Sequence, residues 1–207
     1  MPGCEDRLEC VELDVSSDDS VKAAAEDVGK GGQLLYGVVN NAGIGFGNSF
    51  EVALGTNYFG VRRVCDAFSR YLVRPGGRVV NIASASGPMF VSGLRDKGLK
   101  EKLTLPVAKM PGGIEELDTI AKSYWGQMDY SSDSYGLSKA LLNAYTALHA
   151  QSEPDLIINS CSPGFIDTDI TRGMGGEYCH MLSQVFVLIR SLSFLILYFY
   201  VFYLNNV

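Results

Sequence analysis

Tyr135 and Lys139 are the two residues whose types and spacing point most directly to chemistry. They lie four apart in the segment Tyr-Gly-Leu-Ser-Lys, and residues four apart share one face of a helix. A phenol has a pKa of about 10, too high for acid–base work at neutral pH unless a nearby positive charge favours the phenolate. The pair therefore suits proton transfer to or from a substrate oxygen, although a surface pair on an amphipathic helix has the same spacing.

Three further features have side chains or backbone suited to a site. Ser84 follows the apolar run Arg-Val-Val-Asn-Ile-Ala and can hydrogen-bond a carbonyl oxygen. The segment Asn-Asn-Ala-Gly (40–43) ends another apolar run, and its glycine permits close approach of the backbone to a ligand. Asn57 lies within a helical pattern, where asparagine is a poor helix former and is more often a buried polar or kink residue.

The segments that must position these residues alternate between short apolar runs and amphipathic stretches. Continuous apolar runs are typical of strands in a parallel sheet covered on both faces, so we predict a doubly wound α/β fold. In such sheets the ligand lies beyond the carboxyl ends of the strands, where Asp14, Asn40, Ser84 and Pro163-Gly164 fall. The predicted strands are 8–15 (a strand end), 34–43, 78–84 and 155–164, and the predicted helices are 18–28, 50–73 and 134–150. The expected inward stripe of the second helix is Leu54, Tyr58, Val61, Val64, Cys65, Phe68 and Leu72.

Composition limits the class of protein. The 207 residues are enough for one domain, and 47% hydrophobic with 19% charged residues argues against disorder. The net charge is −6 and no Lys/Arg cluster is present, so no nucleic-acid partner is expected. Five scattered cysteines without a Cys-x-x-Cys pair predict neither disulfides nor a metal site, and the first residues lack the apolar core of a signal peptide. Both observations favour a cytoplasmic location.

Taken together and in order, these motifs resemble the short-chain dehydrogenase/reductase family. The matching segments are Asn-Asn-Ala-Gly (40–43), the helical Asn57, Asn-Ile-Ala-Ser (81–84), Tyr-x-x-x-Lys (135–139) and Ser-Pro-Gly (162–164), and the resemblance covers about residues 8–172. It implies a Rossmann-like fold and reduction of an aldehyde or ketone to an alcohol with a nicotinamide cofactor.

The resemblance also implies roles for individual residues. Tyr135 would be the general acid toward the substrate carbonyl, and Lys139 would lower its pKa and hold the nicotinamide ribose. Ser84 would orient and polarise the carbonyl, and Asn57 would anchor a water between Lys139 and solvent. The implied cofactor contacts are Asp14, Val15, Asn40, Ala42, Gly43, Tyr135, Lys139, Pro163, Gly164, Ile166 and Thr168. The implied substrate contacts are Ser84, Tyr135 and Phe46.

A long insertion, 87–133, separates Ser84 from Tyr135 and contains a predicted helix at 114–124. It resembles the insertion of the carbonyl reductases, and Ile44-Gly45-Phe46 fits that subgroup too. This resemblance implies NADPH rather than NADH and a monomeric state. The insertion could line the substrate site, or it could only cover an apolar face.

The glycine-rich loop that holds the cofactor pyrophosphate in this family has no match in the chain. Gly43-Ile44-Gly45-Phe46-Gly47 lacks the third glycine at the right offset and follows the wrong strand. The first two βα units of the family are therefore expected to be missing, and with them the residue that would choose between NADPH and NADH. An alternative to the reductase is a catalytically inactive, truncated Rossmann-like protein.

The last residues differ in composition from the rest. We divide the chain into a partial Rossmann-type domain, 1–176, and a hydrophobic tail, 183–207. Within the tail, 185–204 carries only Arg190 as a charged residue and is long enough to cross a bilayer. The alternatives are a membrane anchor, a terminus that arises from mis-splicing, and a buried helix.

Overall fold

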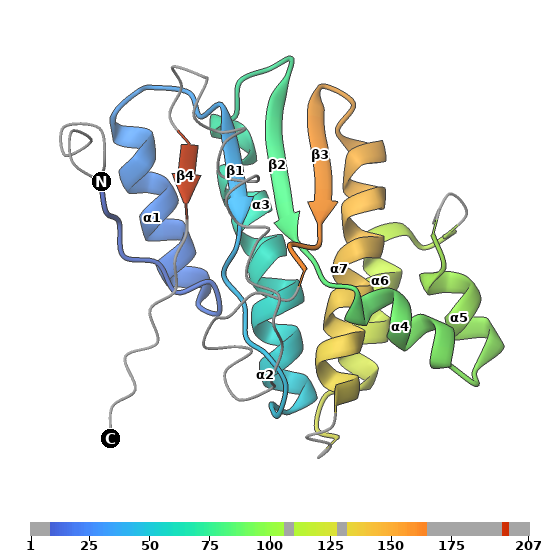
Figure 1. Cartoon of the computed structure of the whole chain (residues 1–207). Helices are drawn as coiled ribbons and strands as arrows, with labels where there is room; N and C mark the ends of the chain where they lie inside the picture. The colour runs from blue at the N-terminus through green and yellow to red at the C-terminus, as the bar shows by residue number, and fades with distance from the viewer. Residues whose placement is uncertain (1–8, 106–109, 128–131, 165–195, 199–207) are drawn as a thin grey trace, which may run out of the picture.

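The computed structural model describes residues 9–105, 110–127, 132–164 and 196–198. Within them, four strands form one parallel sheet in the order β3-β2-β1-β4 (Figure 1). Their bounds are β1 Gly37–Asn40, β2 Gly77–Ile82, β3 Leu156–Cys161 and β4 Ile196–Tyr198. The register pairs Asn40 with Asn81 and Ile82 with Cys161, so the carboxyl ends of β1, β2 and β3 lie along one edge.

Helices connect these strands, as expected for a parallel sheet. Their bounds are α1 Asp18–Lys30, α2 Phe50–Leu54, α3 Val61–Phe68, α4 Ser86–Gly93, α5 Lys97–Leu103, α6 Gly113–Ser123 and α7 Ser132–Ser152. A π-helical turn, η2 Gly55–Gly60, joins α2 to α3, and a 3-10 turn, η3 Ser69–Tyr71, follows α3. The region 50–71 is therefore continuously helical, as the sequence predicts.

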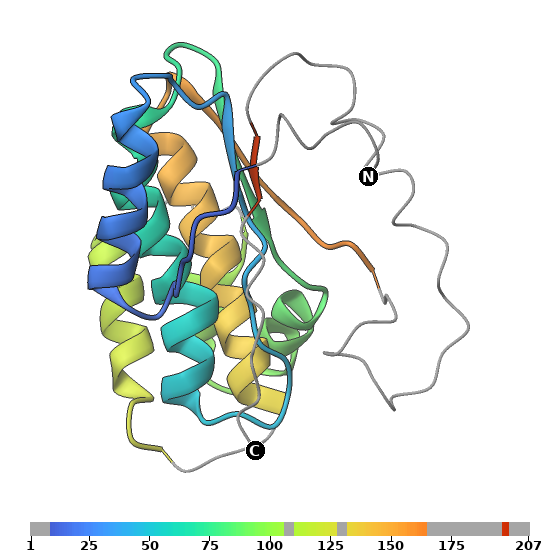
Figure 2. The same cartoon turned by 90° about the vertical axis from the view of Figure 1, so that its left-hand side faces the viewer.

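The core lies between the sheet and the helices α1, α3 and α7, which cover the same face (Figure 2). All seven residues of the predicted stripe are buried, from Leu54 at 0% to Leu72 at 4% exposed. Tyr58 and Tyr145 fill the space between η2 and α7, with ring centroids 6.2 Å apart. The predicted helices and the strands that follow them are thus confirmed, and so is the Rossmann-like α/β class.

Coverage of both sheet faces is not what the described residues show. Along β3 buried and outward residues alternate over the first four positions, and Ile157 is 44% exposed. The reason is that the described helices packed on the sheet lie on one side only (Figure 2). Ile157, in the apolar start of β3, is therefore left on the face that these helices do not cover.

The predicted strand end at 8–15 is wrong within the described residues 9–15. Residues 9–14 form no strand, although Val11 and Leu13 pack against the core and Val15 is buried. A strand requires a neighbouring ladder, and in the described sheet the edge of β1 is paired with β4. The segment instead turns into α1, where the Ser17 hydroxyl caps the helix by accepting from Ser20 N.

The insertion and the tail are described in part. Helix α6 confirms the helix predicted at 114–124, and Asp118 on it pairs with Arg62 and accepts from the Tyr58 hydroxyl at 2.8 Å. In the described parts of the chain, no helix is both long and apolar enough to span a membrane. Residues 185–195 and 199–204 of the predicted span lie outside the described residues, and the domain boundaries remain predictions.

Candidate active site

Tyr135 and Ser84 meet at the carboxyl end of β2. Helix α7 carries Tyr135, Ser84 follows β2, and the Ser84 hydroxyl opposes the rise in the Tyr135 pKa that burial causes. The close packing of α4 against α7 depends on Gly87 in α4, because a Cβ there would lie 2.9 Å from the Lys139 carbonyl carbon. The role of Gly87 could not be recognised from the sequence, where a glycine inside a helical stretch is its only signal.

Lys139 is buried one turn after Tyr135. It is 6% exposed, and its Nζ donates to the Ile82 carbonyl oxygen at 2.8 Å. Burial lowers the pKa of Lys139 to about 8. A larger fraction of this amine is therefore neutral near physiological pH than for an exposed lysine.

The pKa of Tyr135 differs from the sequence expectation in direction. Burial raises it, and the hydrogen bond with Ser84 opposes that rise. Lys139 Nζ lies 5.7 Å from the centroid of the Tyr135 ring and donates its hydrogen bond to the strand. Desolvation is the largest influence on this phenol, and it favours the protonated form.

Asn57 lies in the π-helical turn and is fully buried. Its Oδ1 accepts from Ile44 N at 2.9 Å, and its Nδ2 donates to Ile44 O at 3.0 Å and to the Ser138 hydroxyl at 3.0 Å. A Cβ on Gly43 would lie 3.1 Å from Asn57 Oδ1 and 3.7 Å from Lys139 Nζ. The structure therefore gathers Gly43, Asn57 and Lys139 at one place, on the same edge as Ser84.

Phe46 lies against the catalytic candidate. Its ring centroid is 4.5 Å from that of Tyr135, with the planes inclined at 56°. Phe46 is 36% exposed, so part of its ring is open to a ligand. Its role as a substrate contact stays a prediction.

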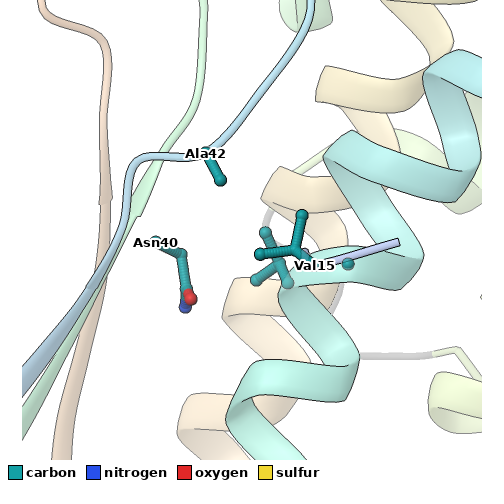
Figure 3. Close-up of a pocket in the computed structure, with 5 residues that line it drawn as sticks. Val15, Asn40 and Ala42 are labelled. Carbon is teal, nitrogen blue, oxygen red and sulfur yellow. The ribbon is translucent and has the colours of Figure 1, made fainter. Parts of the chain in front are cut away.

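Several predicted cofactor contacts line one small pocket. Val15, Asn40 and Ala42 face it together with Gly60 and Val61 (Figure 3). Gly60 and Val61 are not predicted from the sequence as pocket residues; Val61 is predicted only as part of the helix stripe. Asp14 directly precedes the pocket and is exposed; its Oδ1 accepts from Ser16 N at 2.8 Å and from the Ser16 hydroxyl at 2.7 Å.

The segment after β3 begins beside Ser84. Ala83 N donates to Cys161 O at 2.8 Å, so Pro163 and Gly164 emerge next to the strand end that carries Ser84. Gly164 has φ +85°, a conformation that favours glycine. Ile166 and Thr168 lie outside the described residues. Among the described residues, no three His, Cys, Asp or Glu side chains are grouped to hold a metal ion.

Comparison with known proteins gives the family. The short chain dehydrogenase family model matches residues 2–94. Carbonyl reductase (NADPH) 3 of Mus musculus is 30% identical over 184 residues, 80% of this chain and 66% of that protein. (+)-Neomenthol dehydrogenase of Arabidopsis thaliana is 26% identical over 200 residues, covering 79% of this chain and 66% of that protein. The chain thus spans just under two thirds of the length of these relatives.

Solved structures agree on the fold. Salutaridine reductase from Papaver somniferum superposes with a TM-score of 0.64 at 22% identity, covering 79% of this chain and 71% of that one. A short chain dehydrogenase from Burkholderia cenocepacia in complex with NADP gives a TM-score of 0.53 at 22% identity, covering 78% and 56%.

The fold and the site together define a Rossmann-like α/β protein whose Ser, Tyr and Lys side chains gather at the carboxyl ends of parallel strands. The chain belongs to the short-chain dehydrogenase/reductase family and is similar to its carbonyl reductases.

Proposed function

We propose that this protein reduces an aldehyde or ketone to an alcohol with NADPH, using Tyr135, Ser84, Lys139 and Asn57. The observation that carries the proposal is that Ser84 lies close enough to Tyr135 to lower its pKa, with Lys139 Nζ 5.7 Å from the centroid of the Tyr135 ring. Two neighbouring hydroxyls can both donate a hydrogen bond to one oxygen atom that approaches them. That arrangement suits a carbonyl oxygen that gains negative charge during reduction.

In the reductive direction, Tyr135 gives its phenolic proton to the carbonyl oxygen while Ser84 donates a hydrogen bond to the same atom. The cofactor, when bound, supplies the hydride that the carbonyl carbon receives. A protonated Tyr135 is the form that this direction needs, and its raised pKa supports it. Lys139, with a pKa of about 8, can return a proton toward Tyr135.

The described residues fit parts of such a cofactor. At Gly43 a Cβ would meet Asn57 Oδ1 at 3.1 Å, so the missing side chain keeps the space beside Lys139 open. Val15, Asn40 and Ala42, which the resemblance implies as cofactor contacts, lie together beside the end of β1 (Figure 3). For NADPH rather than NADH, the support comes from the carbonyl reductase relatives named for NADPH and from the NADP-bound structural relative.

The first test is NADPH binding to the purified 207-residue chain, followed by fluorescence. We expect binding by wild type and by Tyr135→Phe, with carbonyl-dependent NADPH oxidation reduced about 10²–10⁴-fold in Tyr135→Phe. Tyr124→Phe, a tyrosine on the insertion, is the matched control and should retain turnover. A folded chain that binds no NADPH would contradict the proposal and favour the catalytically inactive alternative. A cytoplasmic location and a monomeric state are further parts of this proposal.

A further inference from the structure

Two buried serines flank Tyr135 on helix α7. Ser134 directly precedes it and Ser138 follows it by three residues, and both serines are 0% exposed. Because the two serines are four residues apart, they lie on one face of the helix. A buried hydroxyl needs hydrogen-bond partners inside the protein. The partners of these two serines connect α7 to the segment 44–48, which follows the Asn-Asn-Ala-Gly motif.

Ser138 bonds to Asn57 in a fixed direction. The Ser138 hydroxyl donates to Tyr135 O at 2.8 Å. A backbone carbonyl only accepts, so the single hydroxyl proton of Ser138 is used in that bond. Ser138 Oγ therefore acts as the acceptor for Asn57 Nδ2, which lies 3.0 Å away. The amide nitrogen of Asn57 is thus turned toward α7.

Asn57 in turn holds the backbone of Ile44. Its Nδ2 donates to Ile44 O at 3.0 Å, and its Oδ1 accepts from Ile44 N at 2.9 Å. The Asn57 amide thus exchanges with Ile44 the same pair of N–H and C=O bonds that two antiparallel strands exchange. Both amide protons of Asn57 are used, one by Ser138 and one by Ile44. Ile44 is therefore fixed relative to α7.

The other end of the segment 44–48 is bonded to α7 directly. The Ser134 hydroxyl donates to Asn48 O at 2.8 Å. Asn48 Nδ2 donates to Gly45 O at 3.0 Å, which closes the segment on itself. We call residues 44–48 the Phe46 loop. Both of its ends are therefore held by serines that lie within one helical turn of Tyr135.

Phe46 lies in the middle of the Phe46 loop. Its ring centroid is 4.5 Å from that of Tyr135, and the residue is 36% exposed. Since the loop is bonded to the same helical turn that carries Tyr135, the two rings are held in a fixed relation to each other. Side chains that a second set of hydrogen bonds holds in place can orient a ligand precisely. Phe46 thus offers a fixed apolar surface beside the Tyr135 ring.

We propose that Ser134 and Ser138 are positioning residues that hold Phe46 beside Tyr135, so that Phe46 forms a fixed apolar wall of the carbonyl-binding site. Neither serine has to touch the substrate, because Ser134 acts through Asn48 and Ser138 acts through Asn57. This inference rests on the proposed function, since it concerns substrate binding at the same site.

The first test is NMR of ring-labelled tyrosine in the full chain without any ligand. An aromatic ring 4.5 Å away shifts the signals of the Tyr135 ring, and Tyr135→Phe assigns these signals. We expect Phe46→Ala to move the Tyr135 signals. Ser134→Ala and Ser138→Ala should move them in the same direction, because each variant releases one end of the Phe46 loop. In the Phe46→Ala background, neither serine substitution should move them further.

Ser152→Ala is the matched control. Ser152 lies on the same helix, and its hydroxyl makes the same kind of bond as that of Ser138, to His149 O at 3.0 Å, but near the far end of α7. It should leave the Tyr135 signals unchanged. Wild-type signal positions in both Ser134→Ala and Ser138→Ala would overturn the inference, and so would equal shifts with and without the Phe46 ring. If Ser138→Ala does not fold, Ser134→Ala decides alone.

The second test is steady-state reduction of benzaldehyde at saturating NADPH by Ser134→Ala. We expect KM for benzaldehyde to rise about five- to ten-fold with kcat within about two-fold of wild type, because a wall contacts the substrate both before and during the reaction. The same substitution in Phe46→Ala should raise KM no further. A lower kcat with unchanged KM would overturn this inference alone. Wild type that oxidises no NADPH with benzaldehyde, together with the expected NMR shifts, would overturn the proposed function alone.

Discussion

Lys139 Nζ lies 5.7 Å from the centre of the Tyr135 ring and bonds to the carbonyl oxygen of Ile82 at 2.8 Å. The lysine is therefore anchored to the sheet, and its positive charge is held in a desolvated place beside the phenol. Two titrating groups with opposite pKa shifts thus share one end of α7, because burial favours the neutral form of each.

Lys139 should make stability depend on pH. Its pKa is lowered to about 8 in the folded chain from a reference value of 10.5, so between these values the unfolded chain binds more protons. The unfolding free energy contributed by this residue should therefore rise with pH across that window and be least favourable below it. Urea unfolding of wild type and Lys139→Met at about pH 7, 8 and 9 measures the difference. A pH-independent difference would contradict the prediction.

Removing the Ser84 hydroxyl should raise the pKa of Tyr135 further. The hydrogen bond from Ser84 is the contribution that opposes burial at this phenol. NMR titration of ring-labelled tyrosine in Ser84→Ala, with Tyr135→Phe to assign the signal, measures the shift. Ser92→Ala removes an exposed hydroxyl from α4 and should leave the Tyr135 titration unchanged. A lower Tyr135 pKa in Ser84→Ala than in wild type would contradict the prediction, because it would mean that the Ser84 hydroxyl raises this pKa.

Gly43→Ala should displace Asn57. The added Cβ would lie 3.1 Å from Asn57 Oδ1, which is held by Ile44 N, so one of the two must shift. We expect a loss of about 1–3 kcal/mol in unfolding free energy together with weaker NADPH binding. Gly55→Ala is the control, because nothing lies within 4 Å of its Cβ position and its φ of −57° is helical. That variant should gain up to about 1 kcal/mol.

Asp118→Asn should loosen the insertion from the helices that it covers. Asp118 pairs with Arg62 and accepts from the Tyr58 hydroxyl, and both Arg62 and Asp118 are about one fifth exposed. Removing the charge leaves the partly buried guanidinium without its counter-ion, and we expect a loss of about 2 kcal/mol by thermal or urea unfolding. Asp27→Asn, which breaks the exposed pair with Lys30, should change stability by less than about 0.5 kcal/mol. Equal effects of the two variants would contradict this assignment.

Periodicity and turn residues sufficed to predict most elements. The stripe from Leu54 to Leu72 is buried as expected, and the motif residues Gly43, Asn57, Ser84, Tyr135 and Lys139 lie near one sheet edge. These features depend on local pattern and on parallel topology, which the sequence expresses directly.

Features that depend on contacts between distant segments could not be predicted in this way. Alternation at 8–15 indicates a strand, but a ladder needs a partner, and Val15 packs as a single buried residue before α1 instead. Gly60 and Val15 line the same pocket, although they lie far apart in the sequence. They pack so closely that a Cβ on Gly60 would lie 2.9 Å from Val15 Cγ2. The sign of the Tyr135 pKa shift likewise required knowledge of its burial.

The π-helical turn at Gly55–Gly60 has a consequence for how this segment tolerates length changes. A π turn contains one residue more than an α turn, so the residues before and after it are out of phase by about 100° on the helix surface. Deleting one residue here would restore a regular helix and rotate Asn57 away from Ile44, while the apolar stripe of α3 would no longer face the same side as α2. A change of length at this point would therefore disturb both the hydrogen bonds of Asn57 and the packing of the helix that follows.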